Sequence, residues 1–237
     1  MKHEVFISGK KYPVAVSWKT MKNVRLKVFP SGEIKLSVPT DTPDDWISAY
    51  LSEKADWIED KLESFVKTRA IEKEEHYISG TSTRILGRQV TVIVHPASQK
   101  SISCEDDLLH IYTTESEQAL IDKQANNWWQ KTAKQYYCEV AKRLYPIIEK
   151  HGIDMPDICV KKMKTLWGSC SRKHCKINLN FFLYKATVPC IEYVILHEML
   201  HLLYPYHNKD FYDLLTIHMP DWESRERQLD YETVLGI

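Results

Sequence analysis

The sequence predicts an α+β fold in which a histidine-containing helix near the C-terminus packs against a small sheet, preceded by a β-rich N-terminal region. Three observations indicate this fold. The first forty residues alternate between apolar and polar side chains, two later stretches have helical periodicity, and an apolar helix follows a further alternating run. At 237 residues, we expect either one compact unit or two regions, 1–78 and 79–237.

The composition is that of a folded protein, with 43% hydrophobic and 27% charged residues. Because 32 basic and 32 acidic residues cancel, the chain does not bind nucleic acid or lipid through its overall charge. No stretch reaches the ~18 apolar residues of a membrane span, and no secretory signal precedes the six cysteines. We therefore expect a cytoplasmic protein with reduced thiols and no membrane partner.

The N-terminal region contains a predicted β-hairpin. Residues 24–28 and 34–38 alternate in polarity and flank the turn residues Pro30, Ser31 and Gly32. Between Val5 and Gly32 there are no acidic residues and six basic ones, Lys10, Lys11, Lys19, Lys22, Arg25 and Lys27. We interpret them as a solvated sheet face rather than a nucleic-acid site, because no aromatic residues are interleaved with them.

The middle of the chain predicts two helices that flank a β segment. An apolar stripe with helical spacing predicts a first helix from Pro43 to about Thr68. Alternating runs at 85–94 and 108–112, joined by a polar loop, predict strands. Thr114 and Glu117 match a capping box, and Pro146 and Gly152 are expected to mark where the long amphipathic helix after them bends or ends.

The residues that indicate a metal-binding or catalytic site lie in a predicted helix that follows Pro189. This helix is apolar on nearly every side, so it is expected to be buried, yet it contains His197, Glu198 and His201. An ionised carboxylate is costly to bury without a partner. Two histidines one turn apart project from the same helix face and can bind one zinc ion, which satisfies these polar groups.

The three residues form an HExxH pattern, which is typical of zinc peptidases. Glu198 lies about 100° around the helix axis from His197, where it can accept a proton from water as a general base without binding the metal. A catalytic zinc ion usually has a third protein ligand. His207, beyond the helix-breaking Pro205, is the favoured third ligand. The alternatives are His218, His174, Asp210 and Asp213.

Two runs upstream of this helix, residues 163–171 and 176–183, supply further candidates. Residues 176–183 alternate as a strand, whose exposed edge could pair with an extended peptide, or which could be an ordinary core hairpin. The candidate substrate-binding residues in the two runs are Trp167, Ser169, Asn178 and Asn180. Cys170 and Cys175 have four residues between them and no second close pair nearby, so we do not favour structural zinc.

The region from Met163 to Leu229 resembles the YgjP-like metallopeptidase-domain family, which is related to the WLM and SprT-type zincins. The resemblance rests on the following segments: Trp167-Gly168-Ser169-Cys170-Ser171, Ile177-Asn178-Leu179-Asn180, Pro189, the HExxH residues 197–201, His207 with Phe211, and Met219-Pro220-Asp221. The N-terminal hairpin, Trp57-Ile58 and Leu86-Gly87-Arg88 extend the resemblance over most of the chain. It implies a zincin-like fold, zinc bound by His197, His201 and His207, and Glu198 as general base.

The predicted function is a zinc-dependent peptidase that hydrolyses peptides or proteins with Glu198 as general base. Candidates for stabilising the oxyanion are Tyr204, Tyr206, Tyr212 and His174. One alternative is a metal-dependent hydrolase of a non-peptide bond, such as a nucleotide phosphoanhydride. The other is a zinc-stabilised binding module that uses the basic hairpin to bind nucleic acid or a protein. The sequence contains no feature that sets an oligomeric state.

Overall fold

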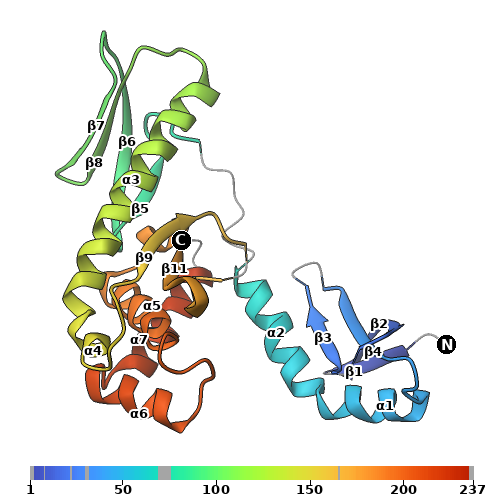
Figure 1. Cartoon of the computed structure of the whole chain (residues 1–237). Coiled ribbons are helices and arrows are strands. Elements are labelled where there is room, and N and C mark those ends of the chain that lie inside the picture. Colours follow the sequence, from blue (N-terminus) through green and yellow to red (C-terminus); the bar gives the residue numbers. More distant parts are fainter. Residues whose placement is uncertain are drawn as a thin grey trace. The chain divides into compact units, whose positions relative to one another are not determined.

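A computed structural model of the chain describes residues 3–7, 9–21, 23–29, 32–68, 76–164 and 166–234. Contacts between residues divide the chain into two compact units, 1–69 and 70–237 (Figure 1). The sequence-based boundary was placed after residue 78. Tyr77, however, is buried in the core of the second unit, and its backbone N–H donates to the Asp122 carboxylate. Within the described ranges, no helix is long and apolar enough to cross a bilayer.

The first unit consists of a four-stranded sheet and two helices. Its strands are β1 (His3–Ile7), β2 (Lys10–Lys19), β3 (Arg25–Val28) and β4 (Ile34–Pro39), in the order β1-β2-β4-β3. The predicted hairpin is the antiparallel pair β3–β4, with Leu26 opposite Leu36. Pro30 and Ser31 of its turn lie outside the described residues. The central pair, β2–β4, is parallel.

Two helices cover one face of this sheet, where a single helix was predicted. They are α1 (Asp44–Glu53) and α2 (Ala55–Thr68). Lys54 interrupts them with φ −94° and ψ 5°, outside the helical conformation. Ile47, Leu51 and Ile58 lie in one core with the sheet residues. The break therefore lets successive apolar residues follow the sheet, which a pattern of helical spacing does not reveal.

The second unit begins with another four-stranded sheet, whose topology repeats that of the first. Its strands are β5 (Ser82–Ile85), β6 (Arg88–Pro96), β7 (Ser101–Glu105) and β8 (Leu108–Thr113), in the order β5-β6-β8-β7. Again two antiparallel hairpins are joined by a central parallel pair, β6–β8. The predicted polar loop is partly wrong, because β7 lies within it as a half-exposed edge strand that needs few apolar residues.

A long helix, α3 (Gln118–Leu144), packs along this sheet (Figure 1). The predicted capping box is wrong. Glu117 occupies the N-cap position without a side-chain hydrogen bond, and the Thr113 hydroxyl accepts a bond from the Glu115 N–H. The predicted end is confirmed, since α3 stops at Leu144 and a short helix, α4 (Pro146–Glu149), follows.

A three-stranded sheet lies against the C-terminal helices. Its strands are β9 (Asp157–Lys161), β10 (Gly168–Ser171) and β11 (Lys176–Asn180), in the order β10-β11-β9. Short 3-10 helices follow β10 and β11, η2 (Arg172–His174) and η3 (Phe181–Lys185). The strand expected to have an exposed edge, β11, is instead central, because β9 pairs with its other side. The two edge strands of this sheet are β10 and β9.

The C-terminal region is helical, and one of its helices is central to the second unit. Its helices are α5 (Val188–Leu200), α6 (Lys209–His218) and α7 (Trp222–Val234). As predicted, α5 is buried along nearly its whole length and has Pro189 in its first turn. α5 contacts α3, α6 and α7 and also strands β10 and β11. These elements therefore fix the position of α5, which contains His197 and Glu198.

Candidate metal centre

The site is built on the last turn of α5. His197 lies inside this turn, and His201 is the residue at its C-terminal end, with its N–H bonded to the His197 carbonyl. The two imidazole ring centroids are 4.9 Å apart. The four-residue spacing thus places both rings on one helix face, as the sequence predicted.

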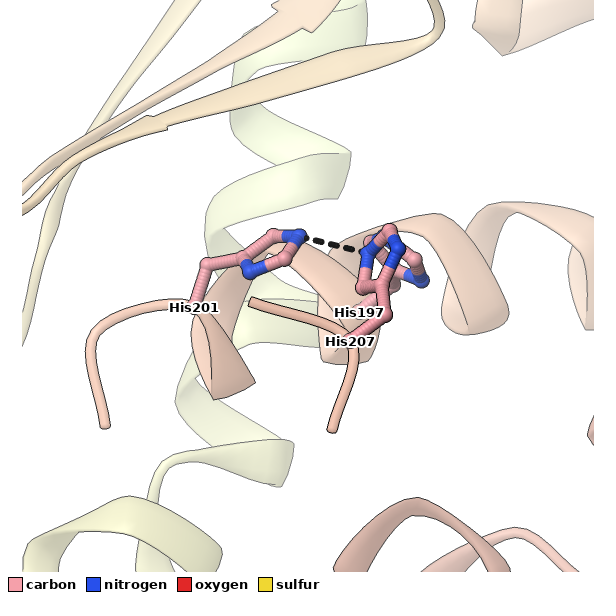
Figure 2. Close-up of side chains that lie close together, drawn as sticks. All are labelled: His197, His201 and His207. Carbon is pink, nitrogen blue, oxygen red and sulfur yellow. Dashed lines mark hydrogen bonds between the residues drawn. The ribbon is translucent and has the colours of Figure 1, made fainter. Parts of the chain in front are cut away.

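The chain then turns back and brings a third imidazole to the first two (Figure 2). His207 Nε2 lies 3.0 Å from His197 Nε2 and 3.0 Å from His201 Nε2. Within the described ranges, this is the only group of three or more histidine, cysteine or acidic side chains close enough to share a metal ion.

Two features keep the ring nitrogens available for a metal. The Nδ1 atom of His201 lies 3.0 Å from the Tyr204 carbonyl oxygen, so it carries the proton and donates it. The Nε2 atom of His201 is therefore left with its lone pair. Burial, together with the neighbouring imidazoles of His201 and His207, lowers the pKa of His197 to about 3, which keeps His197 neutral.

A phenylalanine supports all three imidazoles. Phe211 in α6 is completely buried, and its ring centroid lies 5.1 Å from that of His197, 5.0 Å from His201 and 4.8 Å from His207. The Asn208 side chain caps α6 by accepting the Phe211 N–H at 3.0 Å. Because Asn208 directly follows His207, this cap fixes both the third imidazole and the ring behind it.

Glu198 lies beside the imidazoles on the side that faces β10. It is only 8% exposed. Burial raises the pKa of the Glu198 carboxyl to about 8. A Cβ atom at Gly168 would lie 2.5 Å from Glu198 Cγ and 2.7 Å from Glu198 Oε1. Only a glycine at position 168 therefore leaves room for this carboxylate.

A profile of the YgjP-like family, a metallopeptidase domain, matches residues 22–232. The chain belongs to this family. The solved structure of the metallopeptidase zymogen jannalysin from Methanocaldococcus jannaschii is similar at 21% identity and a TM-score of 0.34. That match covers 39% of this chain and 95% of the jannalysin chain. No curated protein matches the sequence.

Membership of the YgjP-like family implies a divalent metal, and the three imidazoles fit one. Three nitrogens at ~2.1 Å from a tetrahedral zinc ion lie about 3.4 Å from one another. The observed 3.0 Å separations from His207 are close to that value, and all three nitrogens lie within 4.8 Å of one another. The Nδ1 atom of His197 is buried and has no hydrogen-bond partner among the described residues. The polar contact of the His197 ring is therefore made by its Nε2 atom, which faces His207.

The other ligands considered from the sequence do not join this group. His218 ends α6, where the Lys150 ammonium lies 3.2 Å from its Nε2 atom. His174 is exposed in η2, and Asp210 and Asp213 are exposed in α6. The six cysteines are free, and none shares a metal-sized cluster with other described residues.

The candidate substrate residues are not gathered at the imidazoles. Trp167 is half-buried against the core, and its carbonyl accepts the Asn180 N–H at 2.8 Å. Ser169 and Asn178 face each other across β10 and β11 and share a 3.2 Å side-chain hydrogen bond. Because side chains alternate along a strand, this pair lies on the opposite face from Gly168 and Glu198.

Asn180 has a structural role in place of the predicted substrate contact. Its side chain is completely buried, and its amide donates to the carbonyls of Met163 and Leu166, both at 2.8 Å. Its Oδ1 atom accepts the Phe182 N–H at 3.1 Å. The side chain thus fixes the segment before β10 and has no free polar group for a substrate.

Two contributors to the site had no assigned role in the sequence analysis. Gly168 lies in a motif recognised by resemblance, but its close approach to Glu198 depends on how β10 packs on α5. Asn208 is a cap that sequence could have indicated, since asparagine before an apolar helical run is a common helix start. Tyr212 is the oxyanion candidate in ring contact with an imidazole, with its centroid 6.0 Å from that of His207.

Proposed function

We propose that this chain is a zinc-dependent peptidase in which His197, His201 and His207 bind the zinc ion and Glu198 is the general base. One observation carries the proposal, namely the approach of three imidazole Nε2 atoms beside a buried glutamate in a metallopeptidase domain. Three neutral imidazoles with one open position are a typical catalytic zinc site.

Zinc, when bound, supplies a Lewis acid that polarises a carbonyl group and lowers the pKa of a water molecule. Glu198 accepts the proton that this water molecule loses when the water attacks the peptide carbonyl. Glu198 then delivers the proton to the leaving amine. In the metal-free protein, burial raises the pKa of the Glu198 carboxyl to about 8, and a bound cation would lower this pKa and favour the carboxylate that accepts the proton.

A peptide substrate is expected to bind along β10. This strand is an edge of its sheet, so its outward-facing backbone groups can pair with an extended peptide. Gly168, at the start of β10, touches Glu198, which would place the scissile bond next to the general base. Tyr212 is our first candidate for the oxyanion donor because its ring lies beside His207. The six free cysteines support a reducing compartment such as the cytoplasm.

The test is the Glu198→Gln variant, which keeps the size of the side chain but removes the base. We expect zinc to stay bound at one equivalent while casein hydrolysis falls 10²- to 10⁴-fold, the usual contribution of a general base. Glu223→Gln, at an exposed position in α7, is the matched control and should keep full activity. If Glu198→Gln cleaved casein at the wild-type rate, Glu198 would not be the base. Hydrolysis of nucleoside triphosphates without hydrolysis of peptides would replace the peptidase assignment.

A further inference from the structure

The first sheet has a face that points away from α1 and α2, which we call the open face. Side chains along each strand alternate between buried and exposed, as in β1, where Val5 is buried and Phe6 is 62% exposed. Strand register extends the open face across all four strands. Its members are Glu4, Phe6, Lys11, Pro13, Ala15, Ser17, Lys19, Arg25, Lys27, Lys35 and Ser37.

The open face is strongly basic although the chain as a whole has no net charge. It contains five basic side chains and one acidic one. Lys11 pairs with Glu4 at 3.4 Å, and Lys35 pairs with Glu33 at 3.0 Å. Within the described residues, Lys19, Arg25 and Lys27 have no ion-pair partner and are exposed. These three cations are therefore available to an anionic ligand, while the acidic residues of this unit are concentrated in α1 and α2.

Aromatic rings accompany the cations, although the sequence showed no such arrangement. Phe6 in β1 lies opposite Lys11 in β2, with the ammonium 5.8 Å from the ring centroid. At the end of β3, Phe29 has the Lys35 ammonium 5.0 Å from its ring centroid. These pairs come from different strands, so a scan for aromatics between neighbouring basic residues does not find them.

The shape of the open face favours one kind of polyanion. Between the rings and the cations lie only small or compact residues, such as Pro13, Ala15, Ser17 and Ser37. A broad sheet face has no helix that could enter a duplex groove, but it can support unpaired bases that stack on exposed rings. A row of fixed cations can at the same time contact the phosphates.

We propose that the open face binds single-stranded nucleic acid, with phosphates contacting Lys19, Arg25 and Lys27 and a base stacking on Phe6. This binding site is separate in sequence and chemistry from the imidazole cluster and does not depend on the peptidase proposal.

The first test is binding of a labelled 20-nucleotide oligo-dT to the full chain, measured by fluorescence anisotropy over a range of salt concentrations. In the triple variant Lys19→Gln, Arg25→Gln, Lys27→Gln, we expect the slope of log K against log salt to flatten by about 2, because each lost phosphate contact removes about 0.7. The control removes three exposed charges from α3, Lys123→Gln, Lys131→Gln and Lys134→Gln, and should keep the wild-type slope. Equal losses in both variants would overturn the proposal.

The second test separates base stacking from charge. Phe6→Ala should weaken oligo-dT binding about tenfold, within the range of one lost stacking contact, and leave the salt slope unchanged. Tyr231→Ala removes a ring that is similarly exposed, at 64%, from α7 and should have no effect. Wild-type affinity for Phe6→Ala would overturn the stacking role. Polyglutamate or duplex DNA competing as well as unlabelled oligo-dT would overturn the choice of single-stranded nucleic acid.

Discussion

The Gly168 backbone lies against the Glu198 side chain so closely that the smallest added side chain would overlap it. A Cβ atom at position 168 would come within 2.5 Å of Cγ, 2.7 Å of Oε1 and 2.8 Å of Cδ of Glu198. Gly168 has no positive backbone φ, so the need for glycine comes from this approach and not from backbone conformation. The edge strand β10 therefore sets the position of the proposed general base.

We expect Gly168→Ala to displace the Glu198 carboxylate and lower kcat/KM for peptide hydrolysis about 10²-fold, the cost of a misplaced catalytic group. Zinc content should stay at the wild-type level because the imidazoles are not disturbed. The control is Ser171→Ala in the same strand, whose side chain points to the opposite sheet face. Full activity in Gly168→Ala would mean that the position of Glu198 does not limit the reaction.

Glu198 also predicts how the stability of the metal-free protein depends on pH. Burial raises its pKa from 4.5 to about 8, so the folded state binds this proton more tightly than the unfolded state. The free energy of unfolding should therefore fall as pH rises from about 4.5 to about 8, by up to about 1.4 kcal/mol per pH unit.

The measurement is urea denaturation of the zinc-free protein at several pH values, compared with Glu198→Gln, which cannot ionise. The wild-type protein should lose stability relative to the variant as pH rises through this window. If the two proteins show parallel pH profiles, Glu198 does not hold a raised pKa. Zinc should reduce the difference, because a nearby cation favours the charged carboxylate.

Asn180 predicts a large loss of stability from a single buried amide. Asn180→Ala leaves the carbonyls of Met163 and Leu166 without their hydrogen bonds, together with the Phe182 N–H. We expect the free energy of unfolding to fall by about 3 kcal/mol, since each unsatisfied buried group costs about 1–3 kcal/mol. Asn178→Ala removes one bond, to Ser169, and should cost about 1 kcal/mol. A larger loss for Asn178→Ala in urea denaturation would contradict this assignment.

The position of His207 predicts that His207, and not His218, is the third metal ligand. His207→Ala removes the nitrogen that lies 3.0 Å from both other imidazoles, and we expect zinc affinity to fall at least about 100-fold. His218→Ala, eleven residues later beside Lys150, should keep wild-type affinity. Competition with a fluorescent zinc chelator measures both constants. The opposite ranking would make His218 the ligand and require a rearrangement of α6.

Thermal unfolding gives an independent check of the same site. Saturating zinc should raise the stability of the wild-type protein by about 4 kcal/mol at a thousandfold excess over the dissociation constant. In His207→Ala, the same zinc concentration should give a much smaller shift, while His218→Ala should match the wild-type protein.

Several elements could be predicted because short-range patterns fix them. The hairpin of β3 and β4, the end of α3 at Leu144 and the burial of α5 all follow from local periodicity and from proline. The break at Lys54 and strand β7 were missed. In both places, contacts with the sheet decide the structure, and these contacts leave little trace in a single sequence.

By itself, the sequence determined the core of the candidate site. The four-residue spacing of His197 and His201 fixes their common helix face, because helix geometry is local. Only the tertiary structure decided that His207 returns to them, that Gly168 adjoins Glu198, and that β10 is an edge strand while β11 is central. These relationships join segments up to about thirty residues apart. They depend on strand order and on how a sheet packs against a helix, which residue spacing along the chain does not specify.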